Sequence, residues 1–462
     1  MKILSFIFLF SSFICALERK DVSITVYNQN FAVIKDIRTV NLKKGLNTVD
    51  FDETATSLIN ESVRIKFHKS KATILEQNFE YDLINSDKML SRFLESQIKV
   101  ITKDNNSYSG NLLSFDSQNI LIKSEDGKVN MLSRENIKTV EFSKMPENFR
   151  VKPTLVWQVN SPSSSQEDVE VSYMAHNFSW KADYVATLSS DDKSLDLNSW
   201  VSISNNSGAS YDNASLKLMA GDVNLVSEPQ AYSSVMAVRA NKALALEDAA
   251  PQFSEKSFFE YHIYDLSRRT DLKNNQNKQI SLFNASSVKT EKIYSYDGAS
   301  YKWYFYDNWR SQSYNKKVDV TVKFKNSKEN NLGIPLPKGK IRIYKKDGDS
   351  VEFIGEDEID HTPKDEEIEL SVGQAFDIKG ERKITNHQVL ASNLYRDSYE
   401  IKIKNHKDEA VKVVVKEKQW GDWKITESTH DYVKKDKNNV EFTLNIDKNS
   451  SVTLKYSAEY KF

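Results

Sequence analysis

The sequence predicts an all-β, multi-module chain with β-sandwich units, a small barrel insert and one short helix. Three observations predict this class. Apolar and polar residues alternate with a period of two along most of the chain, as in Val22–Tyr27. The alternating stretches are short, and turn residues such as Asn, Gly, Asp and Ser separate them. The length of 462 residues exceeds that of one average domain, so several hydrophobic cores can form.

The first element along the chain reads as an export signal. Lys2 precedes an apolar stretch from Ile3 to Ile14, and charged residues follow. A helix of this length spans about 18 Å, which is short of a hydrocarbon core of about 30 Å. Because Ala16 is a small residue that suits a signal peptidase, residues 1–16 are predicted to be a cleaved signal peptide.

An alternative for the same segment is a lipoprotein signal, in which Cys15 would be acylated. Lipid anchoring at Cys15 is the less favoured reading, because Ile14 stands where such sites usually carry a small residue. Either reading predicts an extracytoplasmic location, periplasmic or secreted. No other stretch reaches 18 apolar residues, so no transmembrane segment is expected after cleavage.

The composition of the chain argues against several classes of partner and site. The formal net charge is −1, so no global attraction to nucleic acid is expected, and we predict no nucleic-acid partner. A single cysteine excludes an internal disulfide framework and a cysteine zinc cluster.

Residues 17–83 predict an N-terminal β module of alternating strands. Residues 84–97 break the alternation and predict a short helix, which Asn85 or Ser86 can cap. Four apolar residues then share one helical face: Met89, Leu90, Phe93 and Leu94.

Residues 98–145 return to strands and predict a small barrel. Five short alternating runs are separated by polar turns, and Gly110 marks a strong bend. In outline this segment resembles Sm-like or SH3-like barrels. Some such barrels bind RNA, but the export signal argues against that role, so we interpret the barrel as a structural insert.

The remainder predicts two further β regions. Residues 150–385 carry strands at the spacing of an Ig-like sandwich, interrupted by an Ala-rich linker over residues 228–256. Residues 386–462 predict a C-terminal β module.

Several ordered motifs extend along the chain. They are ITVYNQNFAVIKDIRTVNLKKG from residue 24, SYMAHNFSWKADYVATL from 172, NNSGASYDNASLKLMAGDVN from 205, EYHIYDLSRRTDLKNNQNKQISL from 260, NSKENNLGIPLPKGKIRIYKKD from 326 and NHKDEAVKVVVKE from 405. In this order they resemble the bacterial domain of unknown function 4139 family over essentially the whole mature chain. The resemblance implies an envelope-associated or secreted, mostly β protein, and it implies no activity.

An acidic stretch is the densest polar feature. In an extended strand Glu356, Glu358 and Asp360 share one face, while Asp357 and His361 point elsewhere. Three carboxylates on one face repel unless a metal ion, such as calcium, or basic side chains lie between them. The alternative is a solvated strand edge whose charges discourage pairing with other strands.

An aromatic run is the second feature. In a strand over residues 301–306, Tyr301, Trp303 and Phe305 face one side. If exposed, they could stack on a glycan or a peptide. The alternative is a hairpin that buries one face in the core.

No sequence motif indicates catalysis. The seven histidines do not occur at metal-pair spacing, and no phosphate loop, dinucleotide fingerprint or Gly-x-Ser-x-Gly elbow occurs. We therefore expect no cofactor and a non-catalytic scaffold or binding protein of the bacterial envelope, whose partner is an unknown envelope protein or a glycan. The alternative is an extracytoplasmic hydrolase with a site between modules, for which Asp357, Asp360 and His361 are the candidate residues.

Overall fold

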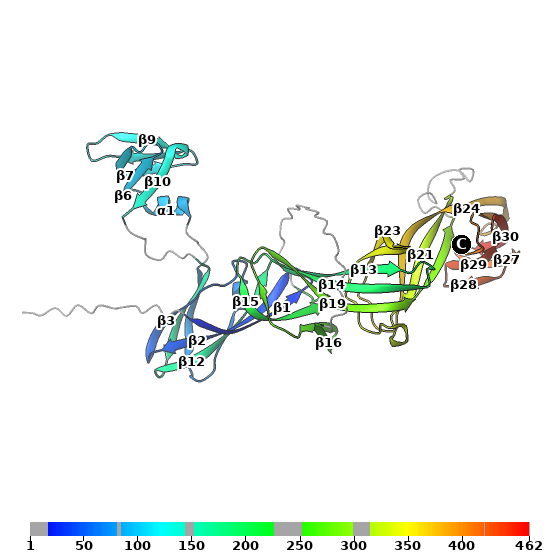
Figure 1. The fold of residues 1–462 in the computed structure, drawn as a ribbon, viewed down its shortest axis with the longest axis horizontal. Helices are drawn as coiled ribbons and strands as arrows, with labels where there is room; N and C mark the ends of the chain where they lie inside the picture. Colours follow the sequence, from blue (N-terminus) through cyan, green and yellow to red (C-terminus); the bar gives the residue numbers. More distant parts are fainter. Residues whose placement is uncertain are drawn as a thin grey trace, which may run out of the picture. The chain divides into compact units, whose positions relative to one another are not determined.

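The computed structural model describes residues 17–80, 85–143, 152–225, 252–298, 315–419 and 421–461. This part of the chain is almost entirely β-structure, arranged in several sheets (Figure 1). The prediction of an all-β, multi-module chain is therefore confirmed. Two compact units are present: unit 1 comprises residues 1–179, 204–217 and 268–277, and unit 2 comprises residues 180–203, 218–267 and 278–462.

The larger sheet of unit 1 is built on antiparallel pairs. Its strands are, in spatial order, β15 (Tyr211–Ala220), β1 (Glu18–Tyr27), β2 (Phe31–Leu42), β12 (Ser165–His176) and β4 (Arg64–Phe67), with β18 (Thr270–Leu272) paired to β15. In β1 every second residue is buried from Val22 to Val26. The alternation that predicted this strand is therefore the alternation between core and surface.

A second sheet of unit 1 has three strands, in the order β3 (Gly45–Phe51), β11 (Thr154–Ser161) and β5 (Thr73–Glu80). Trp157 is fully buried at its centre, and its ring lies 5.3 Å from that of Phe51.

Short 3-10 turns occur at Asn60–Ser62, Arg134–Asn136 and Lys328–Asn330.

The segment predicted as a small barrel lies in the connection between β5 and β11, which are paired neighbours (Glu80 opposite Thr154), and its strands form one five-stranded antiparallel sheet. It contains α1 (Ser86–Arg92), β6 (Gln97–Thr102), β7 (Ser107–Phe115), β8 (Asn119–Lys123), β9 (Val129–Ser133) and β10 (Ile137–Phe142), with the sheet order β10-β6-β7-β8-β9. Leu90 and Phe93 pack into its own apolar core. A Cβ on Gly110 would lie 2.2 Å from the Lys123 carbonyl oxygen, so this bend requires glycine.

The helix predicted over residues 84–97 is shorter than expected. Asn85 is its N-cap and accepts a hydrogen bond from the Lys88 backbone N–H at 2.9 Å. The helix ends at Arg92, and Gln97 already begins β6. Within the described ranges, no helix is long and apolar enough to cross a membrane.

Unit 2 contains a five-stranded sheet in the order β19 (Gln276–Lys289), β14 (Ser194–Asn205), β13 (Phe178–Leu188), β22 (Gly339–Asp347) and β23 (Ser350–Ile359). The β13–β22 pair is parallel, and β22–β23 is an antiparallel hairpin. A further hairpin is formed by β16 (Phe253–Phe258) and β17 (Tyr261–Leu266).

The largest sheet of unit 2 has nine strands. Their order is β27 (Asp422–Ser428), β30 (Ser450–Lys461), β25 (Leu394–Asn405), β24 (Glu367–Ala391), β21 (Lys317–Lys325), β20 (Glu291–Asp297), β26 (Val411–Lys418), β29 (Asn439–Ile446) and β28 (Tyr432–Lys434). One face carries an apolar core that includes Ile401, Phe442 and Leu454. The successive strands β27 and β28 lie at opposite edges of this sheet.

Two predicted boundaries differ from the observed strands. β24 is 25 residues long and runs through the boundary predicted at residue 385, because it pairs with β21 at its beginning and with β25 at its end. β16 begins at Phe253, inside the range predicted as linker, because it pairs with β17. Most of the predicted linker 228–256 lies outside the described residues.

Candidate functional site

The predicted acidic cluster lies on β23 and just beyond it, in unit 2. Glu356 contacts Lys340 of the neighbouring strand β22 at 3.0 Å. Lys338 reaches both Glu358, at 3.6 Å, and Asp360, at 3.0 Å. Basic side chains therefore compensate the carboxylates that share a face. Among the residues that the structure describes, no group of three His, Cys, Asp or Glu side chains is placed to hold a metal ion.

The other two residues of this cluster point into different contacts. Asp357 accepts a hydrogen bond from the Ser371 backbone N–H at 2.7 Å. His361 accepts one from the Lys338 backbone N–H through Nδ1 at 3.1 Å. Burial lowers the pKa of His361 below its usual 6.5, against the opposing charge of Asp222. The structure thus does not bring Asp357 and His361 together as an acid–base pair.

The predicted aromatic face of Tyr301, Trp303 and Phe305 lies outside the described residues, as does Cys15. Both hypotheses stay predictions.

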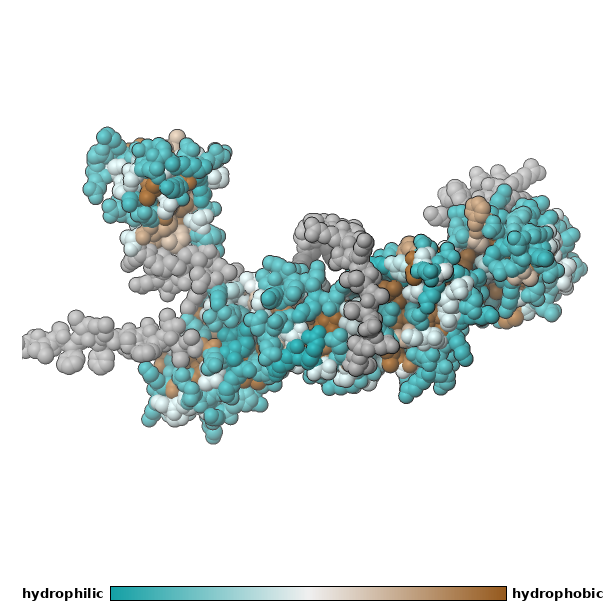
Figure 2. Space-filling model, in the orientation of Figure 1, coloured by the Kyte–Doolittle hydropathy of each residue, from teal (hydrophilic) through white to brown (hydrophobic). Residues whose placement is uncertain are grey.

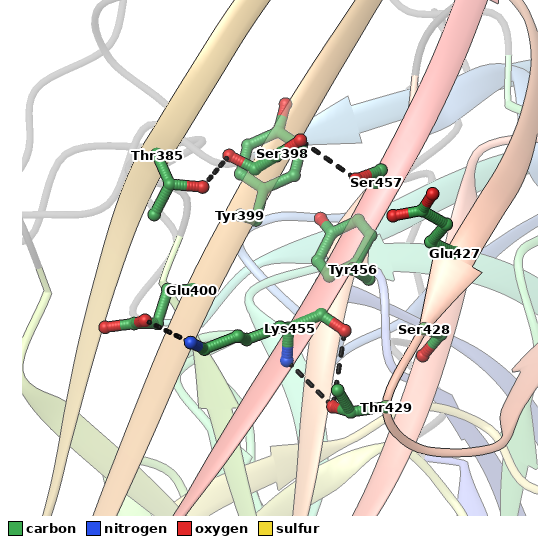
Figure 3. A pocket seen from close by; sticks show the side chains of 10 residues that line it. All are labelled: Thr385, Ser398, Tyr399, Glu400, Glu427, Ser428, Thr429, Lys455, Tyr456 and Ser457. Atoms are coloured by element: carbon green, nitrogen blue, oxygen red, sulfur yellow. Dashed lines mark hydrogen bonds and ion pairs between the residues drawn. The ribbon is translucent and has the colours of Figure 1, made fainter.

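A hollow of about 470 Å³ lies on the nine-stranded sheet, opposite the core, and we call it the hydroxyl hollow (Figure 3). Strands β24, β25, β27 and β30 contribute its walls. Its lining residues are Thr385, Ser398, Tyr399, Glu400, Glu427, Ser428, Thr429, Lys455, Tyr456 and Ser457. The two tyrosines belong to the core, whereas the hydroxyl and charged side chains lie on the other face of the strands, where Ser457 is buried at 8% exposure.

Two irregularities in the strand pairing flank this hollow. In β24 the register against β25 shifts between Ile384 and Asn386, so Thr385 is the extra residue. In β27 the register against β30 shifts between Ile425 and Glu427. Such β-bulges bend a strand and re-aim side chains. Because the second bulge sets Glu427 opposite Ser457, its carboxylate is brought to the face of the hollow (Figure 3).

Cross-strand contacts hold the polar side chains of the hollow in place. The Ser398 and Ser457 hydroxyls hydrogen-bond to each other at 2.9 Å. Glu400 and Lys455 form an ion pair at 3.3 Å. By contrast, the exposed side chain of Glu427 makes no hydrogen bond or ion pair with the rest of the described chain. The hollow therefore combines fixed hydroxyl groups with an uncompensated carboxylate.

The loop between β27 and β28 separates this hollow from a second one of about 530 Å³. Thr429 fixes the loop to β30, since its hydroxyl accepts from the Lys455 backbone N–H at 2.9 Å. The second hollow is lined by Ser428, Thr429, His430, Asp431, Val433, Glu441, Thr443 and Asn445. On the face drawn in Figure 2 the surface of the nine-stranded sheet is mostly hydrophilic.

The core face of the same strands carries a buried acid–imidazole pair. Asp397 is 3% exposed, and its carboxylate contacts Nδ1 of His387 at 2.5 Å. The same carboxylate accepts hydrogen bonds from the hydroxyls of Tyr460 at 2.5 Å and Tyr399 at 3.2 Å. The His387 side chain remains 30% exposed. The pair is formed across the β24–β25 hairpin.

A buried arginine lies deeper in this core. Arg382 donates to both carboxylate oxygens of Glu417, at 2.8 to 3.1 Å, and its guanidinium lies 4.4 Å from the Tyr399 ring centre. Tyr456 donates to the same carboxylate at 2.5 Å. Burial disfavours the cation, but the charge of Glu417 and its hydrogen bonds raise the pKa of Arg382 above its usual value. The protein's own contacts therefore satisfy these core charges.

No sequence pattern singled out the side-chain contacts on either face of these strands. The pairing of His387 with Asp397 follows from a short turn between alternating strands, which the residues between Ala391 and Leu394 could have indicated. The contact between Ser398 and Ser457 joins residues 59 positions apart, and no local pattern indicates it.

These features define a multi-module all-β protein whose C-terminal sheet buries its charges on one face and presents a polar hollow on the other. A family model described as Domain of unknown function (DUF4139) matches residues 169–462. The chain belongs to this family, as the sequence motifs suggested, although the match begins in β12 and leaves the first quoted motif outside it. No curated protein matches the chain.

Proposed function

We propose that the chain is a non-catalytic binding or scaffold protein of the bacterial envelope, and that it acts outside the cytoplasm. The observation that carries the binding role is the hydroxyl hollow. Its polar groups are mounted mainly on four hydrogen-bonded strands, and Thr385 and Glu427, which lie at two β-bulges, both line it. Binding sites on strands are held more rigidly than sites on loops, which favours specific recognition.

The extracytoplasmic location is supported by the sequence. Residues 1–16 combine a basic start, a short apolar segment and a small residue at the end, as signal peptides do. The balanced composition gives no electrostatic reason to expect nucleic acid as a partner. The partner that we propose is an envelope protein or a glycan.

A second candidate is an extracytoplasmic hydrolase, and the pair of His387 with Asp397 favours it. A buried carboxylate on Nδ1 fixes the tautomer and orientation of an imidazole, as catalytic bases require. The same carboxylate also accepts two tyrosine hydroxyls, which is the pattern of a structural anchor. We therefore rank this candidate second.

Site-directed photo-crosslinking of the full chain in cells tests the binding role. A photoreactive residue at position 398 should give an adduct in the extracytoplasmic fraction. The matched control is position 453, where Thr453 lies on the same strand face as Lys455 but does not line the hollow. A chain confined to the cytoplasm contradicts the location, and equal adducts from both positions contradict the site.

The hydrolase candidate is tested with the same purified chain. Turnover of an ester, peptide or glycoside panel that His387→Asn abolishes without unfolding the protein would favour the enzyme. No turnover, or turnover that this change does not affect, counts against it.

A further inference from the structure

We infer that the hydroxyl hollow binds a neutral oligosaccharide, with Glu427 accepting hydrogen bonds from two adjacent sugar hydroxyls. This inference rests on the proposed binding function and names its ligand class. It is carried by three features of the hollow: the kind of polar group, the balance of charge and the length of the polar surface.

The polar groups match those of a sugar. Thr385, Ser398, Ser457 and Ser428 each carry a hydroxyl. The Thr385 hydroxyl donates to the Ser398 carbonyl and the Ser428 hydroxyl to the His430 carbonyl, so both oxygens remain as acceptors. Sugar hydroxyls supply the donors that such acceptors need, whereas a phosphate or carboxylate ligand only accepts. The Ser398 and Ser457 hydroxyls already share one hydrogen bond, so each keeps capacity for a second.

The charges favour an uncharged ligand that is rich in donors. Lys455 is paired with Glu400, so its ammonium is compensated within the hollow. Glu427 is exposed, and its side chain has no ionic or hydrogen-bond partner within the described ranges. An ionised carboxylate only accepts hydrogen bonds and can take one on each oxygen. Two neighbouring hydroxyls of a sugar ring supply such a pair of donors, and an anionic ligand would be repelled.

The bulge in β27 strengthens this assignment. In a regular strand Thr426 and Glu427 would point to opposite faces, but the bulge places both against Ser457. The Thr426 hydroxyl is used by the Ser457 carbonyl at 3.2 Å. Glu427 is the member of this pair that is left to meet a ligand.

The polar surface continues beyond the first hollow. The hollow measures about 470 Å³, and the second hollow, of about 530 Å³, shares Ser428 and Thr429 with it. Each volume is in the usual range for a small-molecule site, about 300 to 1,000 Å³. Asp431, Thr443 and Asn445 continue the same chemistry beyond the loop. The two hollows together fit an extended chain better than a single compact ligand.

The inference is tested by titrating the full chain with neutral hexasaccharides of glucose, mannose and N-acetylglucosamine. At least one should bind. Glu427→Gln should weaken that binding by more than about tenfold, because hydrogen bonds to a charged group are lost. Ser398→Ala combined with Ser457→Ala should weaken it by roughly two- to tenfold, as expected for neutral hydrogen bonds. Thr453→Ala is the matched control and should bind like the parent chain.

Several results would overturn the inference. If no hexasaccharide binds, but position 398 still gives a specific photo-adduct, the sugar assignment fails and the binding function stands. If neither occurs, both fail. An oligolysine peptide serves as a competing probe: binding of this peptide through Glu427, without binding of any sugar, shows that the carboxylate recognises cations. Sugar binding that Glu427→Gln leaves unchanged places the sugar elsewhere.

Discussion

The two faces of β25 and β30 use polar residues in opposite ways. On the core face, Asp397 of β25 is buried, as is Glu417 of β26, which Tyr456 of β30 contacts, and each carboxylate accepts hydrogen bonds from several side chains of the same unit. On the outer face, the hydroxyls of Ser398 and the buried Ser457 have one mutual bond, and Glu427 of the neighbouring strand β27 is exposed. Successive residues of one strand thus serve different purposes, because a strand alternates its side chains between two faces.

We assign the polar groups of the core face to stability and those of the outer face to ligand recognition. A buried charge is tolerated only where partners replace the water that it has lost, so the core-face groups are bound up in the fold. An exposed polar group keeps its water and gives little to stability, but it can exchange that water for a ligand. Substitutions on the two faces should therefore change the free energy of unfolding by very different amounts.

The largest effect is expected for Glu417→Ala. This change leaves Arg382 as a buried charge without its carboxylate, and it removes the acceptor of the Tyr456 hydroxyl. We expect a loss of about 3–5 kcal/mol in the free energy of unfolding. Urea denaturation followed by tryptophan fluorescence measures it, and a loss below about 1 kcal/mol would show that the pair is not essential to the core.

Asp397→Ala is expected to have the next largest effect. The donors on His387, Tyr399 and Tyr460 would lose their common acceptor, and the loss should be about 2–3 kcal/mol. Lys402→Ala, on the outer face of the same strand, is the control and should change stability by no more than about 0.5 kcal/mol. Equal losses in the two variants would contradict the difference between the faces.

Alkaline pH should lower the stability of the protein, in part through the core face. Burial, and then the charge of Glu417, raise the pKa of Tyr456 well above 10. In the unfolded chain this phenol ionises near pH 10, so the stabilising effect is complete below pH 10 and is lost as the pH rises above it, by about 1.4 kcal/mol per pH unit. Denaturation at stepped pH measures the slope, and Tyr456→Phe should reduce it. The same slope in that variant would assign the effect to other groups.

The smallest effect on stability is expected on the outer face. Replacing Ser398 and Ser457 together by alanine removes both partners of one hydrogen bond and leaves neither hydroxyl unpaired. The free energy of unfolding should change by less than about 1 kcal/mol. A thermal or urea midpoint measures it. A change comparable with that of Asp397→Ala would mean that the outer pair is part of the fold.

Much of the architecture could be predicted from the sequence, because half-buried strands show alternating apolar and polar residues. Residues 98–145 contain five strands, as their five alternating runs predicted, and Asn85 caps α1 as its position indicated. β24 could not be divided correctly, since the strand continues through the bulge at Thr385, and its partner changes from β21 to β25 earlier, near Ile378 and Lys379. Pairing between distant strands leaves no local signal.

The candidate site was largely beyond prediction for the same reason. The acidic run at Glu356 was visible as composition, but the lysines that compensate it lie in β22 (Lys340) and directly before it (Lys338), and their position depends on the hairpin. The bulges at Thr385 and Thr426 arise from register against neighbouring strands. A group of side chains that is brought together by strand register can be recognised only once the pairing of the strands is known.

The most direct test compares one variant by two measurements. Glu427→Gln in the full chain is expected to leave the free energy of unfolding within about 0.5 kcal/mol of the parent, since this side chain is exposed. It should also lower the affinity for the neutral hexasaccharide that binds best by more than about tenfold. Unchanged affinity, or a large loss of stability, would contradict the assignment of the outer face to recognition.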